Sequence, residues 1–425
     1  MKEPLIRKKI GTGVSFSAIT DNRYKLNKIS VLFMCRITEE GAAVNALVPS
    51  LLSLCCKRFN TMAALNKKLA GMYSASLGCF ARKAGDIQYV GLNIAAIDSR
   101  YAIDGEDIET EAAELLRDCL FDPYLVEGLF PEKNVELEKQ NQIDDNNAEI
   151  NDKTLYSLKK AYTAAFKGEP AETGCLGENS DIERITPETA VTQYEKLLRD
   201  LRVEIVCVGC NDFIETEKIL KKAFLSVKRE VKHSPENRIS PIKPEPLRIT
   251  ERLDVEQSKL VIVFKSEYRN KPALMVLSAL YGGGEYAKLF KVVREEMSLC
   301  YYCFSRLGYS KGVMTAECGV DHNNLDKAEK ECISQLDEIV KGNFSEEDIE
   351  KTKLSLINSL RSVNDGVSSV SNWYFSRIMD NDIITPEEMV NRINAVTKEE
   401  IIKAADSMKA DTVYVLTSDK KEGEV

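Results

Sequence analysis

Two stretches decide the fold: ITPETAVTQYEKLLRDLRVEIVCVG at residues 185–209 and VTKEEIIKAADSMKADTVYVLTSD at residues 396–419. Each begins with a threonine suited to cap a helix, continues as an amphipathic helical pattern and ends in an apolar strand. The two threonines, Thr186 and Thr397, lie 211 positions apart, and Glu400 completes a capping box in the second copy. The repeated order of elements predicts two copies of one design.

Two further pairs of segments support an internal duplication. FPEKNVELEKQNQI from Phe130 resembles FSEEDIEKTKLSLI from Phe344, which begins 214 positions later. Upstream of each, residues 85–120 and 312–340 both read as an alternating strand followed by a helix with an acidic start. The alternative is two unrelated α+β domains that share common capping chemistry. Similar offsets for three pairs favour the duplication.

A proline-rich polar segment at residues 229–247 is expected to be a linker, because proline removes backbone donors and favours extended chain. It would separate an N-terminal domain, residues 1–228, from a homologous C-terminal domain, residues 248–425. Strands and helices are grouped within each half rather than strictly alternated. This predicts the α+β class, with each domain a mostly antiparallel sheet covered by helices.

Composition excludes several classes of function. The 425 residues carry a formal charge of −9, and no cluster of Lys and Arg is present, which argues against a nucleic-acid partner. No apolar run approaches the roughly 18 residues of a membrane helix, and the charged start of the chain does not resemble a secretory signal. We expect a cytoplasmic protein without a membrane partner, whose twelve cysteines stay reduced.

The stretch GGGEYAKLFKVVREEMSLCYY at residues 282–302 is the richest in candidate functional residues. Gly282, Gly283 and Gly284 allow unusual backbone dihedrals and expose amide groups, although a flexible hinge between two helices is the alternative. The whole stretch resembles the C-terminal signature of the insulinase/pitrilysin zinc peptidases, which include the mitochondrial processing peptidases. The resemblance implies tandem α+β domains of the LuxS/MPP-like metallohydrolase fold. It also implies that Arg294 and Tyr301 hold the substrate and its developing oxyanion, although a simple helix salt bridge is the alternative for Arg294.

Active members of that family carry an inverted zinc motif, H-x-x-E-H, on a helix of the first domain. The corresponding stretch here is NALVPSLLSLCC, in which Pro49 and Ser53 stand at the histidine positions and Leu52 at the position of the general base. The chain has two histidines, His233 and His322, and neither lies in the first 232 residues. The zinc motif is therefore degenerate, and no metal or other cofactor is expected. His322 is expected in a surface turn, without a serine partner.

The third zinc ligand of the family is a glutamate on a later helix. By resemblance, Glu138 stands at the first acid of that pattern and Asp145 at the last, and surface helix carboxylates are the alternative interpretation. Two Cys-x-x-Cys pairs, Cys207/Cys210 and Cys300/Cys303, superficially suggest a zinc site. We interpret them as core packing, because Cys207 points inward from a predicted strand, with Cys210 in the turn after it, and the CYYC stretch is one where β-branched or small residues normally pack.

These observations predict a catalytically inactive peptidase-like subunit rather than an enzyme. The resemblance implies that it binds extended peptide and pairs with a zinc-bearing homologous peptidase subunit as a heterodimer, or associates with itself. Among inactive bacterial members, it most resembles a subfamily linked to modification of elongation factor P. Two alternatives stay open: a stand-alone peptide-binding or scaffold protein, and a metallopeptidase with a substitute metal site built from Glu138, Asp145 and cysteines.

Overall fold

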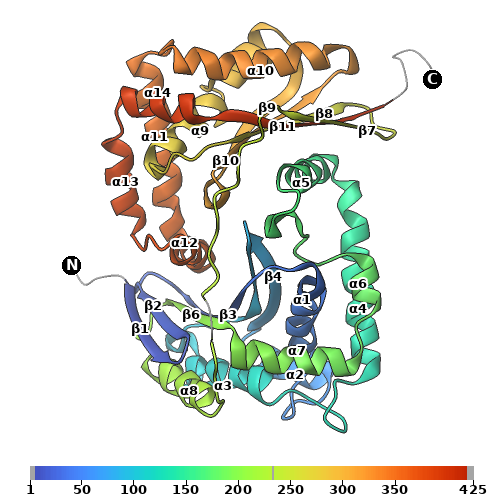
Figure 1. Ribbon diagram of the computed structural model, residues 1–425. Helices are drawn as coiled ribbons and strands as arrows, with labels where there is room; N and C mark the ends of the chain where they lie inside the picture. The colour runs from blue at the N-terminus through green and yellow to red at the C-terminus, as the bar shows by residue number, and fades with distance from the viewer. Residues whose placement is uncertain (1–4, 232–233, 419–425) are drawn as a thin grey trace. The chain divides into compact units, whose positions relative to one another are not determined.

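The computed structural model describes residues 5–231 and 234–418, which form two units (Figure 1). Unit 1 takes the described residues within Met1–Asn147, Thr173–Glu236 and Val363–Ile383; unit 2 takes those within Ala148–Glu172, Asn237–Ser362 and Ile384–Val425. None of the helices in these ranges combines the length and apolar composition needed to cross a bilayer. His233 lies outside the described residues.

Unit 1 is built on a six-stranded sheet in the order β1-β2-β6-β3-β5-β4, in which the β2–β6 pair is parallel and the others are antiparallel. Its strands are β1 Leu5–Gly11, β2 Val14–Thr20, β3 Leu26–Arg36, β4 Ser76–Ala84, β5 Ile87–Ile97 and β6 Arg202–Gly209. Its helices are α1 Glu39–Leu54, α2 Met62–Gly71, α3 Ile108–Phe121, α4 Glu132–Ala148, α6 Asn179–Glu183, α7 Pro187–Asp200, α8 Ile214–Leu225 and α12 Val367–Met379.

Unit 2 repeats this plan on a five-stranded sheet, β7-β11-β8-β10-β9, with β7–β11 as its parallel pair. Its strands are β7 Leu247–Arg252, β8 Ser258–Lys265, β9 Cys300–Gly308, β10 Val313–Val320 and β11 Lys409–Thr417. Its helices are α5 Lys153–Ala165, α9 Lys271–Gly282, the π-helix η4 Leu289–Glu296, α10 Leu325–Val340, α11 Glu346–Ser362, α13 Pro386–Asn394 and α14 Lys398–Ser407. The 3-10 segments of the chain are Ser99–Tyr101, Glu149–Asn151, Pro170–Glu172, Tyr309–Lys311, His322–Asn324 and Val363–Asp365.

The threonine caps lie where the sequence places them. Thr186 accepts from the backbone of Thr189 at the start of α7, and Thr397 forms a capping box with Glu400 at the start of α14. The strand that follows each helix, β6 or β11, lies between a parallel and an antiparallel neighbour in its sheet. The predicted α+β class with mostly antiparallel sheets covered by helices is confirmed.

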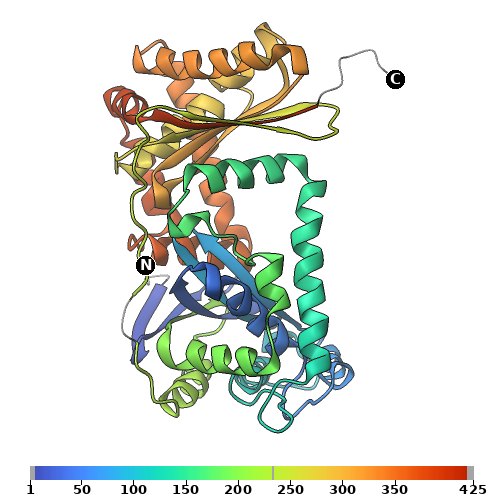
Figure 2. The ribbon, with the colours of Figure 1, turned by 45° about the vertical axis from the view of Figure 1, so that its right-hand side comes forward.

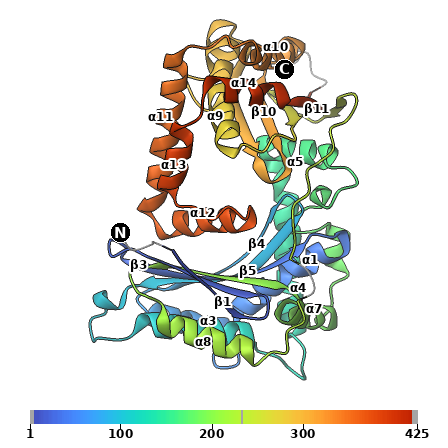
Figure 3. The same ribbon diagram turned by 60° about the vertical axis from the view of Figure 1, so that its left-hand side comes forward.

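One helix of each sequence half packs on the sheet of the other half. The helices α5 and α12 are both 13 residues long and begin 214 positions apart, the offset of the sequence repeat. In unit 2, α5 packs on one face of the sheet through Ala161 and Ala165, and α10 covers the other face (Figures 1 and 2). In unit 1, α12 covers the sheet through Val370 and Tyr374, opposite α3 and α8 (Figure 3).

The exchange has a physical reason. Without α5, the buried face of β8 and β11 would expose Val261, Val263 and Leu416 to water, and without α12 the face of β6 would expose Val206 and Val208. Burying apolar surface stabilises the folded state by about 25 cal/mol per Å². The compact units therefore differ from the contiguous segments 1–228 and 248–425, because α5 belongs to unit 2 and α12 to unit 1. The two segments describe the sequence repeat, and their boundaries stay a prediction.

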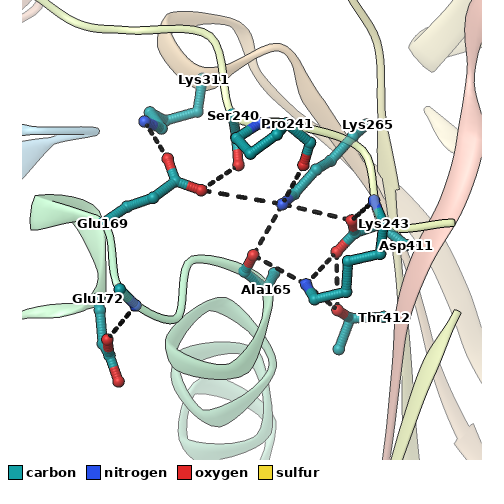
Figure 4. A network of polar contacts seen from close by, with 11 residues as sticks. Ala165, Glu169, Glu172, Ser240, Pro241, Lys243, Lys265, Lys311, Asp411 and Thr412 are labelled. Carbon is teal, nitrogen blue, oxygen red and sulfur yellow. Dashed lines mark hydrogen bonds and ion pairs between the residues drawn. The ribbon is translucent and has the colours of Figure 1, made fainter. Parts of the chain in front are cut away.

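A buried ammonium group fixes the end of α5 within unit 2 (Figure 4). Lys265 of β8 is almost completely buried, and its Nζ donates to the carbonyls of Ala165 (2.7 Å) and Pro241 (3.0 Å) and lies 3.3 Å from Asp411. Asp411 also accepts from Lys243 at 2.7 Å. Burial lowers the pKa of Lys265, while the hydrogen bonds from Lys243 outweigh burial and lower the pKa of Asp411. Each buried charge is thus paired.

Replacing Asp411 should destabilise unit 2. Asp411→Asn removes the nearer counter-ion of the buried Lys265 ammonium and leaves Glu169 at 4.0 Å; breaking a buried ion pair typically costs about 3–5 kcal/mol. Asp406→Asn, at an exposed carboxylate 3.9 Å from Lys409, is the matched control and should change stability by less than about 0.5 kcal/mol. Denaturant unfolding at neutral pH measures both, and equal midpoints for the two variants would contradict the proposed role of the network.

The ion pair of Lys265 and Asp411 also predicts how the free energy of unfolding changes with pH. Because the folded-state pKa of Asp411 lies below its ordinary value of 3.8, its contribution is fully present above that value. The contribution is lost as the pH falls through the folded-state pKa. The difference in unfolding free energy between wild type and Asp411→Asn should therefore shrink in acid and be constant from pH 5 to pH 7.

Candidate functional site

The helix at the position of the zinc motif is α1, which is packed like a core helix. Thr38 caps it by accepting from the amide of Gly41, and most of its residues from Ala42 onward are buried. Pro49 is buried inside the helix, where it removes one backbone donor. Leu52 lies in the apolar core of unit 1, and the hydroxyl of Ser53 donates to the carbonyl of Ser50 at 2.8 Å. None of the three motif positions presents a metal ligand or a general base.

The helix α4 runs antiparallel to α1. Near its start, Asn134 lies 3.9 Å from the Cys55 sulfur just beyond the end of α1, and near its end Gln142 donates to the carbonyl of Ala43 at 3.1 Å. Residues four apart share a face of a helix, so Glu138 faces the middle of α1. Asp145, seven residues or about two turns after Glu138, is exposed. Of the two sequence-predicted acids, Glu138 is the one directed toward the degenerate motif.

Partial burial and a neighbouring negative charge dominate the environment of Glu138. Partial burial raises its pKa, the negative charge of Asp145 raises it further, and the hydrogen bond from Asn141 at 3.2 Å partly offsets both. Within residues 5–231 and 234–418, a group of three or more close metal-ligating side chains occurs at one place, and Glu138 and Asp145 do not belong to it. These two acids hold no complete ligand set.

Arg294 and Tyr301 lie at the surface of unit 2. The guanidinium of Arg294, on η4, stacks 4.5 Å from the centroid of the Phe290 ring, and its Nε is 3.6 Å from the carboxylate of Glu295. Tyr301 on β9 is 56% exposed, and its hydroxyl donates to Asp321 at 3.0 Å. The contact with Glu295 joins adjacent residues in the chain and leaves Arg294 half exposed. Both side chains are therefore available to a ligand.

The glycine run joins α9 to the segment before η4. Gly282 is buried at the end of α9, where an added Cβ would lie 2.5 Å from the amide nitrogen of Ser305 on β9. At Gly283, an added Cβ would lie 2.6 Å from the Cα of Ala279. Glycine is required for this close approach of helix and strand. Gly284 follows in the turn, with the Tyr286 ring beside it.

His322 has a serine partner, and the expectation that it lacks one is wrong. Its Nδ1 is 2.7 Å from the hydroxyl of Ser258 and 3.1 Å from that of Thr417. The sequence did not indicate this contact because Ser258 begins β8, 64 positions earlier in the chain. Ser258 is completely buried, so no substrate reaches its hydroxyl and the pair does not form a nucleophile.

The sequence also did not indicate which strands form the edges of the first sheet. They are β1 and β4, and the partner of β4 in the sheet is β5. The segment after Thr173 covers the end of β4, because Lys83 donates to the carbonyl of Thr173 and Cys175 to that of Ala81. Among the described residues, Ser76–Phe80 pairs with no strand on its outer side. An edge of this kind accepts an extended peptide as an added strand.

Known proteins resemble this chain in sequence and in structure. Residues 184–356 match the family model described as the peptidase M16 inactive domain. The chain is thus similar to M16-like peptidases. It is 26% identical over 408 residues to the probable inactive metalloprotease YmfF of Bacillus subtilis, covering 95% of this chain and 96% of that protein. The resemblance to the insulinase/pitrilysin family is confirmed, and so is the prediction of a non-catalytic homologue.

Solved structures show the same fold for the M16-like chain. A conserved protein from Enterococcus faecalis superposes with a TM-score of 0.90 at 25% identity, over 99% of this chain and 100% of that one. The peptidase M16 inactive domain from Pseudomonas fluorescens superposes with a TM-score of 0.80 at 14% identity, over 99% and 100% of the two chains. The two-domain M16-like fold is thus confirmed over nearly the full length.

The acids on α4 should not bind metal. We expect the double variant Glu138→Gln with Asp145→Asn to contain the same amount of metal as the wild type, because the described part of the chain brings no set of three converging ligands to these two acids. Elemental analysis after gel filtration in metal-free buffer measures this, with the single variant Glu136→Gln on the exposed side of α4 as control. A loss of metal in the double variant alone would establish a substitute site.

Proposed function

We propose that the chain is a non-catalytic subunit that binds extended peptide and pairs with a zinc-bearing homologous peptidase subunit. One asymmetry carries the proposal. The helix α1 keeps its packing but has Pro49, Leu52 and Ser53 at the three reactive positions. Arg294 and Tyr301, by contrast, keep polar groups exposed at the surface of unit 2. A chain selected only for stability has no need of both residues.

The open edge of β4 supports peptide binding. Main-chain donors and acceptors on the outer side of Ser76–Phe80 are directed away from β5 and would pair with an added strand. Main-chain pairing supplies affinity with little selection among side chains, which suits a subunit that receives many sequences. Cys79 is the exposed side chain in the middle of this segment.

The polar groups of Arg294 and Tyr301 suit the stabilisation of a peptide in a shared site. A guanidinium and a phenol both donate hydrogen bonds, and donors aimed at a developing oxyanion lower the barrier of peptide hydrolysis. In the proposed pair the partner supplies zinc and its water, and this chain supplies donors. As part of the same proposal we place the chain in the cytoplasm, where its thiols stay reduced.

Reconstitution with a zinc-bearing homologue tests this function. The two chains should form a stoichiometric complex on gel filtration with mass measurement, and the complex should cleave peptides faster than the zinc chain alone. Persistent lack of association would support the stand-alone binding protein instead. A homodimer that excludes the zinc chain would support self-association and would contradict the proposal.

Substitutions of the two donors should impair the reconstituted pair. We expect Arg294→Ala and Tyr301→Phe each to lower the turnover number by about 10²–10³-fold, the usual effect of removing one oxyanion donor. Arg361→Ala, at an exposed arginine of α11, is the control and should leave turnover unchanged. Full turnover by both donor variants would exclude a shared active site.

Hydrogen exchange should locate the peptide. A bound strand protects the amides of the edge it joins, so peptide should slow exchange at Ser76–Phe80. The opposite edge of the same sheet, β1, is the internal control and should exchange at an unchanged rate. If the peptide slowed exchange only at β1, or at neither edge, it would not add to β4.

A further inference from the structure

Three cysteines of unit 2 converge in its core, and an extra residue in β9 brings a fourth, Cys300, to the same face of the sheet. Along the β9–β10 pair, Cys303 lies opposite Cys318 and Tyr302 opposite Gly319, but the next residue of β10, Val320, lies opposite Cys300. In a regular strand, residues three apart point to opposite faces. The additional residue, Tyr301, shifts Cys300 to the face of Cys303, as β-bulges do. The bulge thus turns a Cys-x-x-Cys strand into a pair of thiols on one side.

Two further thiols complete the group. The sulfur of Cys303 is 2.6 Å from that of Cys318 on β10 and 4.0 Å from that of Cys332 on α10. The sulfurs of Cys318 and Cys332 are 3.5 Å apart. All three residues are buried, and the bulge places Cys300 on the sheet face of Cys303 beside them. Three elements of the unit therefore direct thiols at one point in its core.

This arrangement differs from ordinary core packing of cysteine. Among the described residues, Cys303, Cys318 and Cys332 are the one group of three or more side chains whose ligating atoms lie within 4.8 Å of one another, and the bulge brings Cys300 to the sheet face of Cys303. Cys207, by comparison, lies buried in β6 among apolar side chains, as the sequence predicted. Four thiols packed together forgo the apolar contacts that a leucine or valine would make at each position. A ligand that needs sulfur explains their convergence better than packing does.

The spacing fits one metal ion. Zinc bound tetrahedrally by thiolates, with Zn–S distances of about 2.3 Å, places the sulfurs about 3.8 Å apart. Two of the three separations, 3.5 and 4.0 Å, agree with this value, and the third lengthens as thiols become ligands. An iron–sulfur cluster inserts its own metals and sulfides between the ligands and requires wider spacing.

We propose that these four cysteines bind a single zinc ion as a closed thiolate site. The ligands are Cys300, Cys303, Cys318 and Cys332. Coordination releases the thiol protons to solvent and leaves no open position for water, so the ion is structural rather than catalytic. It cross-links β9, β10 and α10 and holds the bulge at Tyr301. The site lies in unit 2 and is independent of the degenerate motif on α1.

Metal analysis of the purified full-length chain tests the proposal. Protein produced with zinc and kept reduced should contain about one zinc ion per chain, the stoichiometry of a four-thiolate site. Cys332→Ser and Cys300→Ser should each reduce the bound zinc several-fold or more. Cys207→Ser, a buried cysteine outside the group, is the matched control and should retain it. Zinc retained by both ligand variants would overturn the proposal.

A second measurement does not depend on the folding of any variant. Cobalt added to the metal-free wild-type chain should give the intense near-ultraviolet sulfur-to-metal charge transfer and visible bands of tetrahedral thiolate coordination, and zinc should displace it. Absence of these bands, together with metal-free protein as isolated, would contradict the site. A disulfide between Cys303 and Cys318, detected by mass spectrometry after alkylation under reducing growth conditions, would also contradict it.

Discussion

The buried ammonium of Lys265 is the interaction on which the architecture depends. It sits beneath the sheet of unit 2 and binds the last carbonyl of α5, a helix that comes from the other half of the sequence. A charge in that place is tolerated because the carboxylates of Asp411 and Glu169 and two carbonyls surround it, and it would be costly if any of these moved away. The network thus specifies that α5, rather than another amphipathic helix, completes the core of unit 2.

The exchange of α5 and α12 has a consequence for folding. Neither sequence half contains all the residues that cover its own sheet, so each unit completes its core only when both halves are present. Domains are often able to fold alone, but these two share helices in both directions. A separately expressed C-terminal half would lack the carbonyl that Lys265 binds and the apolar face of α5.

Much of this fold could be predicted from local sequence. The caps Thr186 and Thr397 mark helices that lead into β6 and β11, and the offset of 214 residues aligns α4 with α11. The exchange could not be predicted, because an amphipathic pattern shows that a helix has an apolar face but not which sheet receives it. Lys265 gave no signal either, since it reads as the polar end of an apolar strand.

The candidate sites, too, could be predicted from the sequence only in part. The loss of imidazole at Pro49 and Ser53 could be predicted, because it follows from the absence of histidine in the first 232 residues. The convergence of Cys303, Cys318 and Cys332 could not, because it depends on the register of β9 against β10 and on the packing of α10. Inactivation of the zinc helix is therefore a local chemical change within a retained framework, and α1 stays packed as a core helix.

The central claim is that the chain alone has no hydrolytic activity, and a peptide-library assay tests it most directly. The purified chain is incubated with zinc and a mixture of peptides of varied sequence, and the products are identified by mass spectrometry. The account predicts the same products as in a parallel sample without the chain. Cleavage that co-purifies with the chain and stops on addition of a chelator would contradict it.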